Sequence, residues 1–376
     1  METNVPSAKI YFPEEDRKKI LNKIDDVLKS GYLTLGKYGK ELEQKFAKYT
    51  GTKYAIAVNS GTSALEISLI ASGVKNNSVI LPTNTFAATA FAVHHSRNKI
   101  IFADCDNDFN MNPDSLNENI GKDTKAVILV HIGGNISKNI SEIKKICDDN
   151  KLILLEDAAH AHGSSLNDKK AGTFGLTSSF SFYPTKVMTS GEGGMILTDD
   201  EILYKKACQF RDQGKEGFFS NSIVEMGYNW RMSELHAILG IEQLKRLDSF
   251  ISDRRRIAKI YDKRLKEIES VQSLEFPTKL NMKSNYYKYI AVLEKGIDRG
   301  KLKKDLKEKF GISLSGEVYD TPLHLQHIFK KECNTKEGDF PNAEELCSRQ
   351  ICLPDFATMT NEQADYVIDS LKEVLK

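Results

Sequence analysis

The sequence predicts an α/β protein: a mostly parallel β-sheet sandwiched by helices forms its larger part, and a smaller α+β domain follows. Between residues 54 and 198, short apolar runs alternate with helical stretches, which is typical of βαβ crossovers in a sheet buried on both faces. From about residue 233 the pattern becomes helical, and short strands mixed with helices follow. The 376 residues suffice for two or three domains, and we expect a large domain over residues 1–250 and a small one over 251–376.

The first two elements are expected to be helices. Acidic residues after Pro13 suit a first helical turn, and Gly31 can end that helix. One face of it carries apolar residues, namely Ile20, Leu21, Ile24, Val27 and Leu28. A second helix is expected over about Tyr38–Tyr49.

Seven short apolar runs are expected to form the buried sheet. They are Tyr54–Val58, Ser78–Leu81, Ile100–Phe102, Ala126–Val130, Leu152–Leu155, Phe180–Tyr183 and Met195–Thr198. Helices such as Ala64–Ala71 and Ile140–Asp149 are expected to connect them.

The C-terminal part is expected to begin with a pair of linking helices. Their apolar stripes start at Leu235 and at Ile257. The lysine-rich segment over residues 301–309 is interpreted as one amphipathic helix with a solvated face. Thr360 and Gln363 predict a capping box at the start of the last helix.

Composition and motif spacing exclude several classes of protein. Lys+Arg 53 against Asp+Glu 52 leaves a formal net charge of +1, so neither nucleic acid nor an anionic membrane is an expected partner. No run approaches the roughly 18 apolar residues of a membrane span, and no secretory signal precedes the first helix, so we expect a cytoplasmic protein. The six cysteines form no C-x-x-C and are expected to be reduced, and no histidine pair has metal-ligand spacing.

A glycine-rich segment, Gly31-x-x-x-x-Gly36-Lys37, imitates a nucleotide-binding P-loop. However, Tyr38 stands where the Ser or Thr that binds magnesium would be needed, and a helix rather than a strand precedes the segment. The sequence therefore does not predict nucleotide hydrolysis.

Three segments at predicted strand ends carry candidate chemistry. Residues 59–63 follow the first strand and open a helix, so their amides and hydroxyls could hold a phosphate, although a plain helix cap has the same pattern. Glu156 and Asp157 follow a very apolar strand, at the sheet edge where ligands of α/β folds bind. Lys186 stands alone among apolar and glycine residues, where desolvation favours the neutral amine that a Schiff-base nucleophile requires, although a lysine after a strand, judged by itself, is more often solvated than catalytic. Together these segments match the phosphate anchor, ring-nitrogen partner and lysine that pyridoxal 5'-phosphate requires.

These segments belong to a longer series of motifs that resembles the DegT/DnrJ/EryC1/StrS sugar aminotransferases, which are similar in fold to aspartate aminotransferase (fold type I). The series covers most of the chain, in order. It comprises Gly31-Tyr-Leu-Thr-Leu-Gly36, Ser60-Gly-Thr-Ser-Ala-Leu65, Pro82-Thr-Asn-Thr-Phe86, Glu156-Asp-Ala-Ala-His-Ala-His-Gly163, Ser179-Phe-Ser-Phe-Tyr183, Lys186, Gly191-Glu-Gly-Gly194, Gly227-Tyr-Asn-Trp-Arg-Met232 and Pro322-Leu-His324.

The resemblance implies a role for each matching residue. Lys186 would form the Schiff base with pyridoxal phosphate and act as the base of the proton shift, and Asp157 would pair with the protonated ring nitrogen. The other implied cofactor-binding residues are Gly61, Thr62, Ser63 and Ser181 at the phosphate, Phe86 on the ring face, His160 near the ring hydroxyl, and Asn229 at the phosphate of the neighbouring subunit. The last of these implies a homodimer with shared active sites.

Three positions depart from the family pattern. His160 replaces a glutamine found in many relatives. A histidine there still offers a hydrogen bond to the ring hydroxyl but could alter the acidity of the Schiff base. The loop over His131–Ser137 lacks a common aspartate and could shape the sugar pocket, and Trp230 occupies a position usually held by Tyr.

The expected activity is transfer of an amino group, from L-glutamate, to a keto group of a nucleotide-linked deoxysugar, which gives an amino sugar for surface glycans or a secreted metabolite. A cyclic polyol ketone is an alternative acceptor for the same chemistry. A pyridoxal-phosphate-dependent sugar dehydratase and a non-catalytic regulator are alternatives of other classes. In the dehydratase branch a histidine replaces the lysine, so the presence of Lys186 argues against it.

Overall fold

The computed structural model describes residues 4–274 and 281–376. Its centre is a seven-stranded sheet with the strand order β1-β9-β8-β5-β4-β2-β3. The strands are β1 (Tyr54–Val58), β2 (Ser78–Pro82), β3 (Lys99–Ala103), β4 (Thr124–Val130), β5 (Ile153–Asp157), β8 (Thr177–Ser181) and β9 (Gly194–Thr198). Only β9 runs antiparallel to its neighbours, β1 and β8, so the prediction of a mostly parallel sheet is confirmed.

One predicted strand lies in a shifted position. The run Phe180–Tyr183 was expected to be extended, but β8 begins at Thr177 and ends at Ser181. Beyond that point the chain leaves the sheet: the Phe182 N–H donates to the Gly193 carbonyl, and the Phe182 carbonyl accepts from Ser190 N–H. This turn carries the segment with Lys186 out from the sheet edge.

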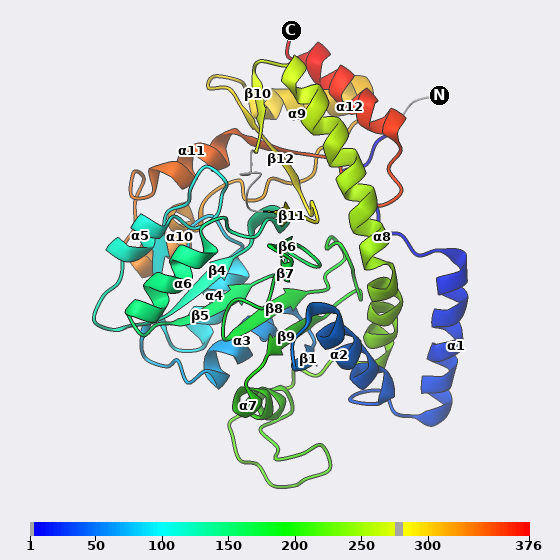
Figure 1. Ribbon diagram of the computed structural model, residues 1–376, viewed down its shortest axis with the longest axis vertical. Helices are drawn as coiled ribbons and strands as arrows, with labels where there is room; N and C mark the ends of the chain where they lie inside the picture. Colours follow the sequence, from blue (N-terminus) through cyan, green and yellow to red (C-terminus); the bar gives the residue numbers. More distant parts are fainter. Residues whose placement is uncertain (1–3, 275–280) are drawn as a thin grey trace.

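Helices cover both faces of the large sheet (Figure 1). Alternate strand residues divide between two cores, because successive side chains of a strand point to opposite faces. Ala57 and Leu129 face α2 (Lys37–Thr50), α6 (Ile140–Asp149) and α8 (Glu234–Arg264). Val58 and Ile128 face the opposite side, which is covered by α3 (Gly61–Ala71), α4 (Ala87–His95) and α7 (Glu201–Arg211).

The long helix α8 corrects the prediction of two linking helices. It is one continuous helix of 31 residues. Its buried stripe continues through Leu247, Ile251 and Ile257, and no glycine or proline interrupts this stretch. Figure 1 shows α8 running from the large sheet to the C-terminal helix α12 (Asn361–Val374), so it crosses the domain boundary that we propose near residue 250.

The first helix, α1 (Glu14–Ser30), is less buried than its apolar face predicts. It lies along the outer side of α8 (Figure 1). Ile20 and Val27 are buried there, whereas Leu21 and Leu28 are 65% and 63% exposed. The neighbouring helices cover only part of the apolar stripe.

The smaller part of the molecule is built on a second, antiparallel sheet in the order β10-β12-β13. Its strands are β10 (Val271–Ser273), β12 (Tyr289–Leu293) and β13 (Gln350–Leu353), and its helices are α9 (Arg299–Phe310), α10 (His327–Cys333), α11 (Pro341–Arg349) and α12. The capping box predicted at Thr360 and Gln363 is present at the start of α12. The remaining elements among the described residues are α5 (Pro113–Glu118), the small strands β6 (Ser165–Leu166), β7 (Lys169–Lys170) and β11 (Met282–Lys283), and the 3-10 turns Ile132–Gly134, Leu265–Glu267 and Leu323–Leu325.

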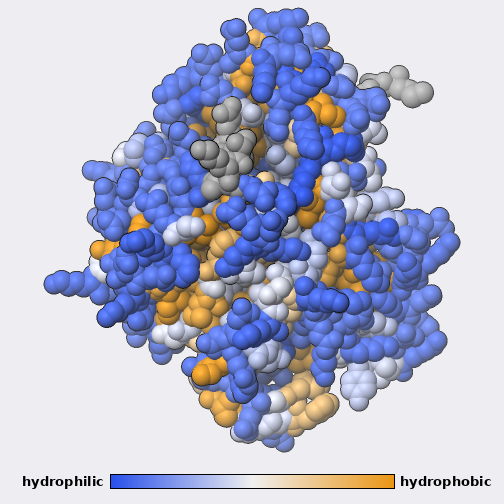
Figure 2. Space-filling model, in the orientation of Figure 1, coloured by the Kyte–Doolittle hydropathy of each residue, from blue (hydrophilic) through white to orange (hydrophobic). Residues whose placement is uncertain are grey.

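The face shown in Figure 2 is mostly hydrophilic, with apolar side chains at the lower tip of the molecule. This tip is a hairpin over residues 212–229, which follows α7 (Figure 1). Its exposed apolar residues include Phe219, Ile223 and Met226. Among the described helices, none is both long and apolar enough to cross a membrane.

Candidate active site

A cavity of about 580 Å³ opens at the carboxyl ends of β1, β5 and β8 and is closed on one side by residues of the small domain. Seven of the residues predicted from the sequence lie on its wall: Gly61, Thr62, Phe86, Asp157, His160, Ser181 and Lys186. Segments that are more than a hundred residues apart in the chain therefore meet at one site. Ser63 and Asn229 are not among its lining residues.

The first wall of the cavity is the start of α3. Ser60 caps this helix: its Oγ accepts from Ser63 N–H at 3.1 Å, and Ser60 N–H donates to Ser63 Oγ at 3.2 Å. The capping box therefore uses both polar groups of Ser63, and Ser60 rather than Ser63 faces the cavity. The N–H groups of Gly61 and Thr62 belong to the first helical turn, which has no acceptors within the helix and lies at the positive end of its dipole. They are suited to binding a phosphate.

The absence of a side chain at Gly61 allows this helix start to approach β8. A Cβ atom on Gly61 would lie 2.8 Å from the Ser181 Cβ and 3.2 Å from the Ser181 Cα. Neither atom is the end of a flexible side chain, so an added methyl group would have to displace backbone. Gly61 and Ser181 thus form two sides of a narrow polar cradle.

Asp157 lies at the floor of the cavity, at the last position of β5. Its Oδ2 accepts from Thr89 Oγ1 at 2.8 Å, and its Oδ1 accepts from Ala159 N–H at 3.2 Å. Burial raises the pKa of Asp157, and the hydrogen bond from Thr89 and the charge of Lys186 oppose this rise only in part. The carboxylate would be stabilised by a cationic group bound in the cavity.

The neighbouring acid, Glu156, points away from the cavity and is fully buried. Its Oε2 pairs with His131 Nε2 at 2.8 Å and accepts from Gly172 N–H at 2.8 Å. Its Oε1 accepts from the N–H groups of Phe174 and Gly175, at 2.6 and 2.7 Å. Burial acts to raise the pKa of Glu156, but these hydrogen bonds outweigh it and hold the pKa below its ordinary value. Glu156 therefore ties the turn before β8 to β4 and β5.

Lys186 enters the cavity from the loop after β8. Its N–H donates to the Tyr183 carbonyl at 3.0 Å, and its Nζ lies 4.7 Å from the centre of the Tyr287 ring. Burial lowers the pKa of Lys186 to about 8, although the charge of Asp157 acts in the opposite direction. About a tenth of the amine is thus neutral at pH 7, far more than for an ordinary lysine, and a Schiff-base lysine reacts in this form.

His160 lies on the cavity wall between aromatic residues of the small domain. Its ring packs against Tyr287 with the centroids 4.3 Å apart, and its Nε2 lies 3.4 Å from the hydroxyl of Tyr319. Burial lowers the pKa of His160, and the charges of Lys186 and Lys288 lower it further. The imidazole is therefore neutral and can exchange hydrogen bonds with a hydroxyl group in the cavity.

Several lining residues lie outside the motifs of the sequence analysis, among them Thr89, Tyr287, Lys288 and Tyr319. Thr89 lies three residues after Phe86, within α4, so helical spacing from that motif was the available signal. The other three belong to the small domain, and no local pattern predicts that they reach strand ends of the large sheet.

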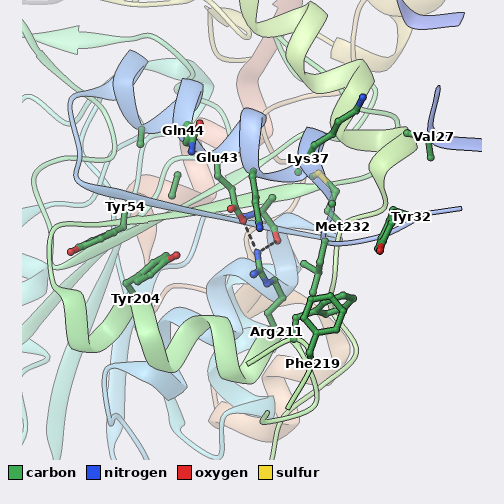
Figure 3. Close-up of a pocket in the computed structure, with 18 of the residues that line it drawn as sticks. Val27, Tyr32, Lys37, Glu43, Gln44, Tyr54, Tyr204, Arg211, Phe219 and Met232 are labelled. Atoms are coloured by element: carbon green, nitrogen blue, oxygen red, sulfur yellow. Dashed lines mark hydrogen bonds and ion pairs between the residues drawn. The ribbon is translucent and has the colours of Figure 1, made fainter. Parts of the chain in front are cut away.

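A second and larger hollow, of about 880 Å³, lies between α2, α7 and the hairpin (Figure 3). Its charged residues at the floor are already paired, because Arg211 Nη1 donates to Glu43 Oε1 at 2.6 Å. Tyr54 and Tyr204 stack on each other at one end, and Phe219 lies at the other. None of the predicted chemistry-bearing residues lines this hollow.

The smaller cavity fits pyridoxal 5'-phosphate. The glycine-lined cradle suits its phosphate, Asp157 suits its protonated ring nitrogen, and the Lys186 amine suits its aldehyde. Phe86 and His160 are placed for the ring face and the ring hydroxyl. The fold and these residues define a pyridoxal-phosphate-dependent aminotransferase.

The chain belongs to the DegT/DnrJ/EryC1/StrS aminotransferase family, whose model matches residues 14–372. This confirms the family predicted from the motifs, with its pyridoxal phosphate dependence and its role in nucleotide-sugar transamination.

The chain is similar over nearly its whole length to members of this family. It is 33% identical to the spore coat polysaccharide biosynthesis protein SpsC of Bacillus subtilis, over 96% of this chain and 95% of the relative. It is 33% identical to the GDP-perosamine synthase of Escherichia coli O157:H7, over 90% of each chain. The solved PLP form of the putative sugar aminotransferase Spr1654 from Streptococcus pneumoniae has a TM-score of 0.90 and 26% identity, over 99% of both chains. This similarity confirms the predicted fold type.

Proposed function

We propose that this protein transfers the amino group of L-glutamate to a keto group of a nucleotide-linked deoxysugar, and that it acts as a homodimer with shared sites. The observation that carries the proposal is the convergence, in one cavity, of a lysine with a pKa of about 8, a buried carboxylate and a phosphate cradle. The relatives SpsC and GDP-perosamine synthase, named for polysaccharide and amino-sugar synthesis, support the class of acceptor.

The cofactor supplies an aldehyde that takes the amino group and a ring that stabilises negative charge on the adjacent carbon. The chain's own residues position the reaction around it. Gly61 and Thr62 would hold the phosphate through their N–H groups, and Asp157 would hold the proton on the ring nitrogen. Lys186 Nζ would take up and return the proton that moves in the reaction, because burial lowers its pKa to about 8.

A second copy of the chain is part of the proposal, because Asn229 does not reach its own cavity. It lies at the base of the hairpin, where it forms a β-bridge with Asp212, and its side chain is exposed. The hairpin also exposes Phe219 and Met226, which are 87% and 89% accessible, and such a concentration of apolar surface favours an interface. A partner that covers the hairpin would accept Asn229 at its own phosphate cradle.

Two inactive variants test the shared site. Lys186→Ala and Asn229→Ala are purified separately, mixed, and allowed to exchange subunits. If Asn229 acts on the partner's cofactor, a mixed dimer contains one site with both residues intact, and activity returns. If activity stays at the sum of the separate variants, Asn229 does not act across an interface.

The transaminase proposal is tested by the absorption spectrum of the protein loaded with pyridoxal phosphate, before and after addition of L-glutamate. We expect conversion to the pyridoxamine form with release of an equal amount of 2-oxoglutarate, and no conversion in Lys186→Ala. A protein that binds the cofactor and is converted by no amino donor would not be a transaminase. A panel of nucleotide-linked keto-sugars, with a cyclic polyol ketone as the alternative acceptor, then identifies the second substrate by return of the original spectrum.

A further inference from the structure

Some charged residues on the cavity wall are assigned to the cofactor, and others are not. The charged lining residues are Asp157, Lys186, Glu192, Lys288 and Glu317. Asp157 and Lys186 are assigned to the cofactor. The remaining three charged residues are two acids, Glu192 and Glu317, and one cation, Lys288. A cation is of interest here because both substrates of the proposed reaction are anionic.

The two acids do not neutralise Lys288. Glu317 is 9% exposed and is already paired with Lys303 at 2.5 Å and with Arg299 at 3.8 Å. Glu192 is itself exposed to solvent, in the glycine loop that follows the lysine segment. Within the described part of the chain, no acidic side chain forms an ion pair with Lys288, whose Nζ donates only to the Gly316 carbonyl, at 3.3 Å.

The backbone that carries Lys288 is held firmly against the large domain. The key residue is Asn285, which is fully buried. Its Nδ2 donates to the carbonyls of His160 and His162 at 2.8 and 2.9 Å, and its Oδ1 accepts from Tyr287 N–H at 2.9 Å. Lys288 N–H donates in turn to the Gly133 carbonyl at 3.0 Å. The lysine is thus presented from a fixed backbone, and only its side chain is free to follow a ligand.

The ring of Tyr287 lies near both Lys288 and the reacting amine of Lys186. Its ring centre lies 4.7 Å from Lys186 Nζ and 5.4 Å from Lys288 Nζ, so both ammonium groups are within cation–π range of one ring. The two Nζ atoms are therefore at most about 10 Å apart and line the same cavity, so an anion bound at Lys288 lies on the side of the amine at which the donor nitrogen reacts. The α-carboxylate of an amino acid is attached to the same carbon as its nitrogen, whereas the diphosphate of a nucleotide sugar lies beyond the whole sugar ring. The position of Lys288 favours the donor.

We propose that Lys288 binds a carboxylate of the amino donor and is a specificity-determining residue for the donor half of the reaction. This inference rests on the proposed transfer from an acidic amino acid. The phosphate of the cofactor does not compete for Lys288, because this phosphate is assigned to the cradle at the start of α3. Lys288 would release the carboxylate with the keto acid and leave the cavity free for the acceptor.

The test compares the wild-type holoenzyme with Lys288→Met and Lys288→Arg, and uses Lys301→Met as a control. Lys301 is an exposed lysine in α9 that lines no described cavity. Two readouts are taken. The first is calorimetric binding of glutarate, which has the two carboxylates of glutamate and no amino group. The second is the dependence of cofactor conversion on glutamate concentration.

Loss of a charge-assisted hydrogen bond should weaken glutarate binding about tenfold to a hundredfold in Lys288→Met and raise the half-saturating glutamate concentration by a similar factor. The limiting rate of conversion should change little, and Lys288→Arg and Lys301→Met should resemble the wild type. Binding of uridine, thymidine and guanosine diphosphates should be unaffected by Lys288→Met. Weaker nucleotide binding with normal glutarate binding would overturn the assignment to the donor.

Failure of this inference is distinguishable from failure of the proposed function. If glutamate converts the wild type and Lys288→Met with the same concentration dependence, Lys288 has no role in donor binding and the transaminase proposal stands. If glutamate does not convert the wild type, the proposed donor is wrong and the inference falls with it.

Discussion

The adjacent acids Glu156 and Asp157 should have opposite phenotypes when each is replaced by its amide. Glu156→Gln should destabilise the protein while leaving the cavity intact, because Glu156 bonds only to buried groups behind the site. Asp157→Asn should barely change stability but should abolish transamination, because Asp157 faces the cavity. The pair is a matched comparison within one strand.

The cost of Glu156→Gln follows from its four hydrogen bonds. The amide oxygen can still accept from the N–H groups of Phe174 and Gly175, but the amide nitrogen would face two donors, Gly172 N–H and His131 Nε2. His131 can change tautomer and accept, whereas the Gly172 N–H cannot, and one buried unsatisfied donor costs about 1–3 kcal/mol. The two retained hydrogen bonds would lose their charged acceptor, which costs about 1 kcal/mol each. This cost is offset in part because the variant no longer buries a carboxylate. We expect a net loss of about 2–4 kcal/mol.

The assay is urea unfolding of the apoprotein followed by circular dichroism, at one fixed protein concentration. Glu156→Gln should shift the midpoint to lower urea, and the folded variant should still bind pyridoxal phosphate with an affinity close to that of the wild type. Asp157→Asn should unfold near the wild-type midpoint. A Glu156→Gln protein of unchanged stability, or an Asp157→Asn protein that still converts with glutamate, would refute this division of roles.

Four further outcomes are expected. Recombination of the apoprotein with pyridoxal phosphate, followed by stopped-flow absorbance, should accelerate with pH and level off above about pH 8, because only neutral Lys186 reacts; a bend near the ordinary lysine value of about 10.4 would contradict this. Asp157→Asn removes the charge that raises this pKa, so the bend should move to lower pH. Gly61→Ala should weaken cofactor binding in equilibrium dialysis by about tenfold or more, because it fills the cradle, while Gly121→Ala in an open loop should not; equal affinities would remove the cradle from the site. Phe219→Ser should shift the protein toward monomer in sedimentation velocity, and an unchanged profile would count against the hairpin as an interface.

Local patterns determined most of the fold and much of the site. Apolar runs located the seven strands of the large sheet, and the capping residues Thr360 and Gln363 located the start of the last helix. The failures occurred where local pattern is ambiguous. Two apolar stripes near residue 250 fit either two helices or one, and only packing along both domains makes α8 continuous. The apolar face of α1 did not reveal that Leu21 and Leu28 would stay exposed.

The sequence by itself determined which residue types are available for chemistry and the order in which they occur. It did not determine which of two adjacent acids faces the cavity. Asp157 shares its strand face with Leu155, which packs toward α3 and α4, whereas Glu156 shares the opposite face with Leu154. Which face is open to a ligand depends on the helices that cover each side.

Only the tertiary structure brought Tyr287, Lys288 and Tyr319 to the cavity. They are more than one hundred residues from Lys186, and the positions of Tyr287 and Lys288 are set by contacts such as those of Asn285 with the His160 and His162 carbonyls. Contacts over such separations follow from the packing of whole domains, which leaves no periodic signal in the residues that make them. A local motif can therefore predict a cofactor, but the residues that select its substrates come from how the domains close around it.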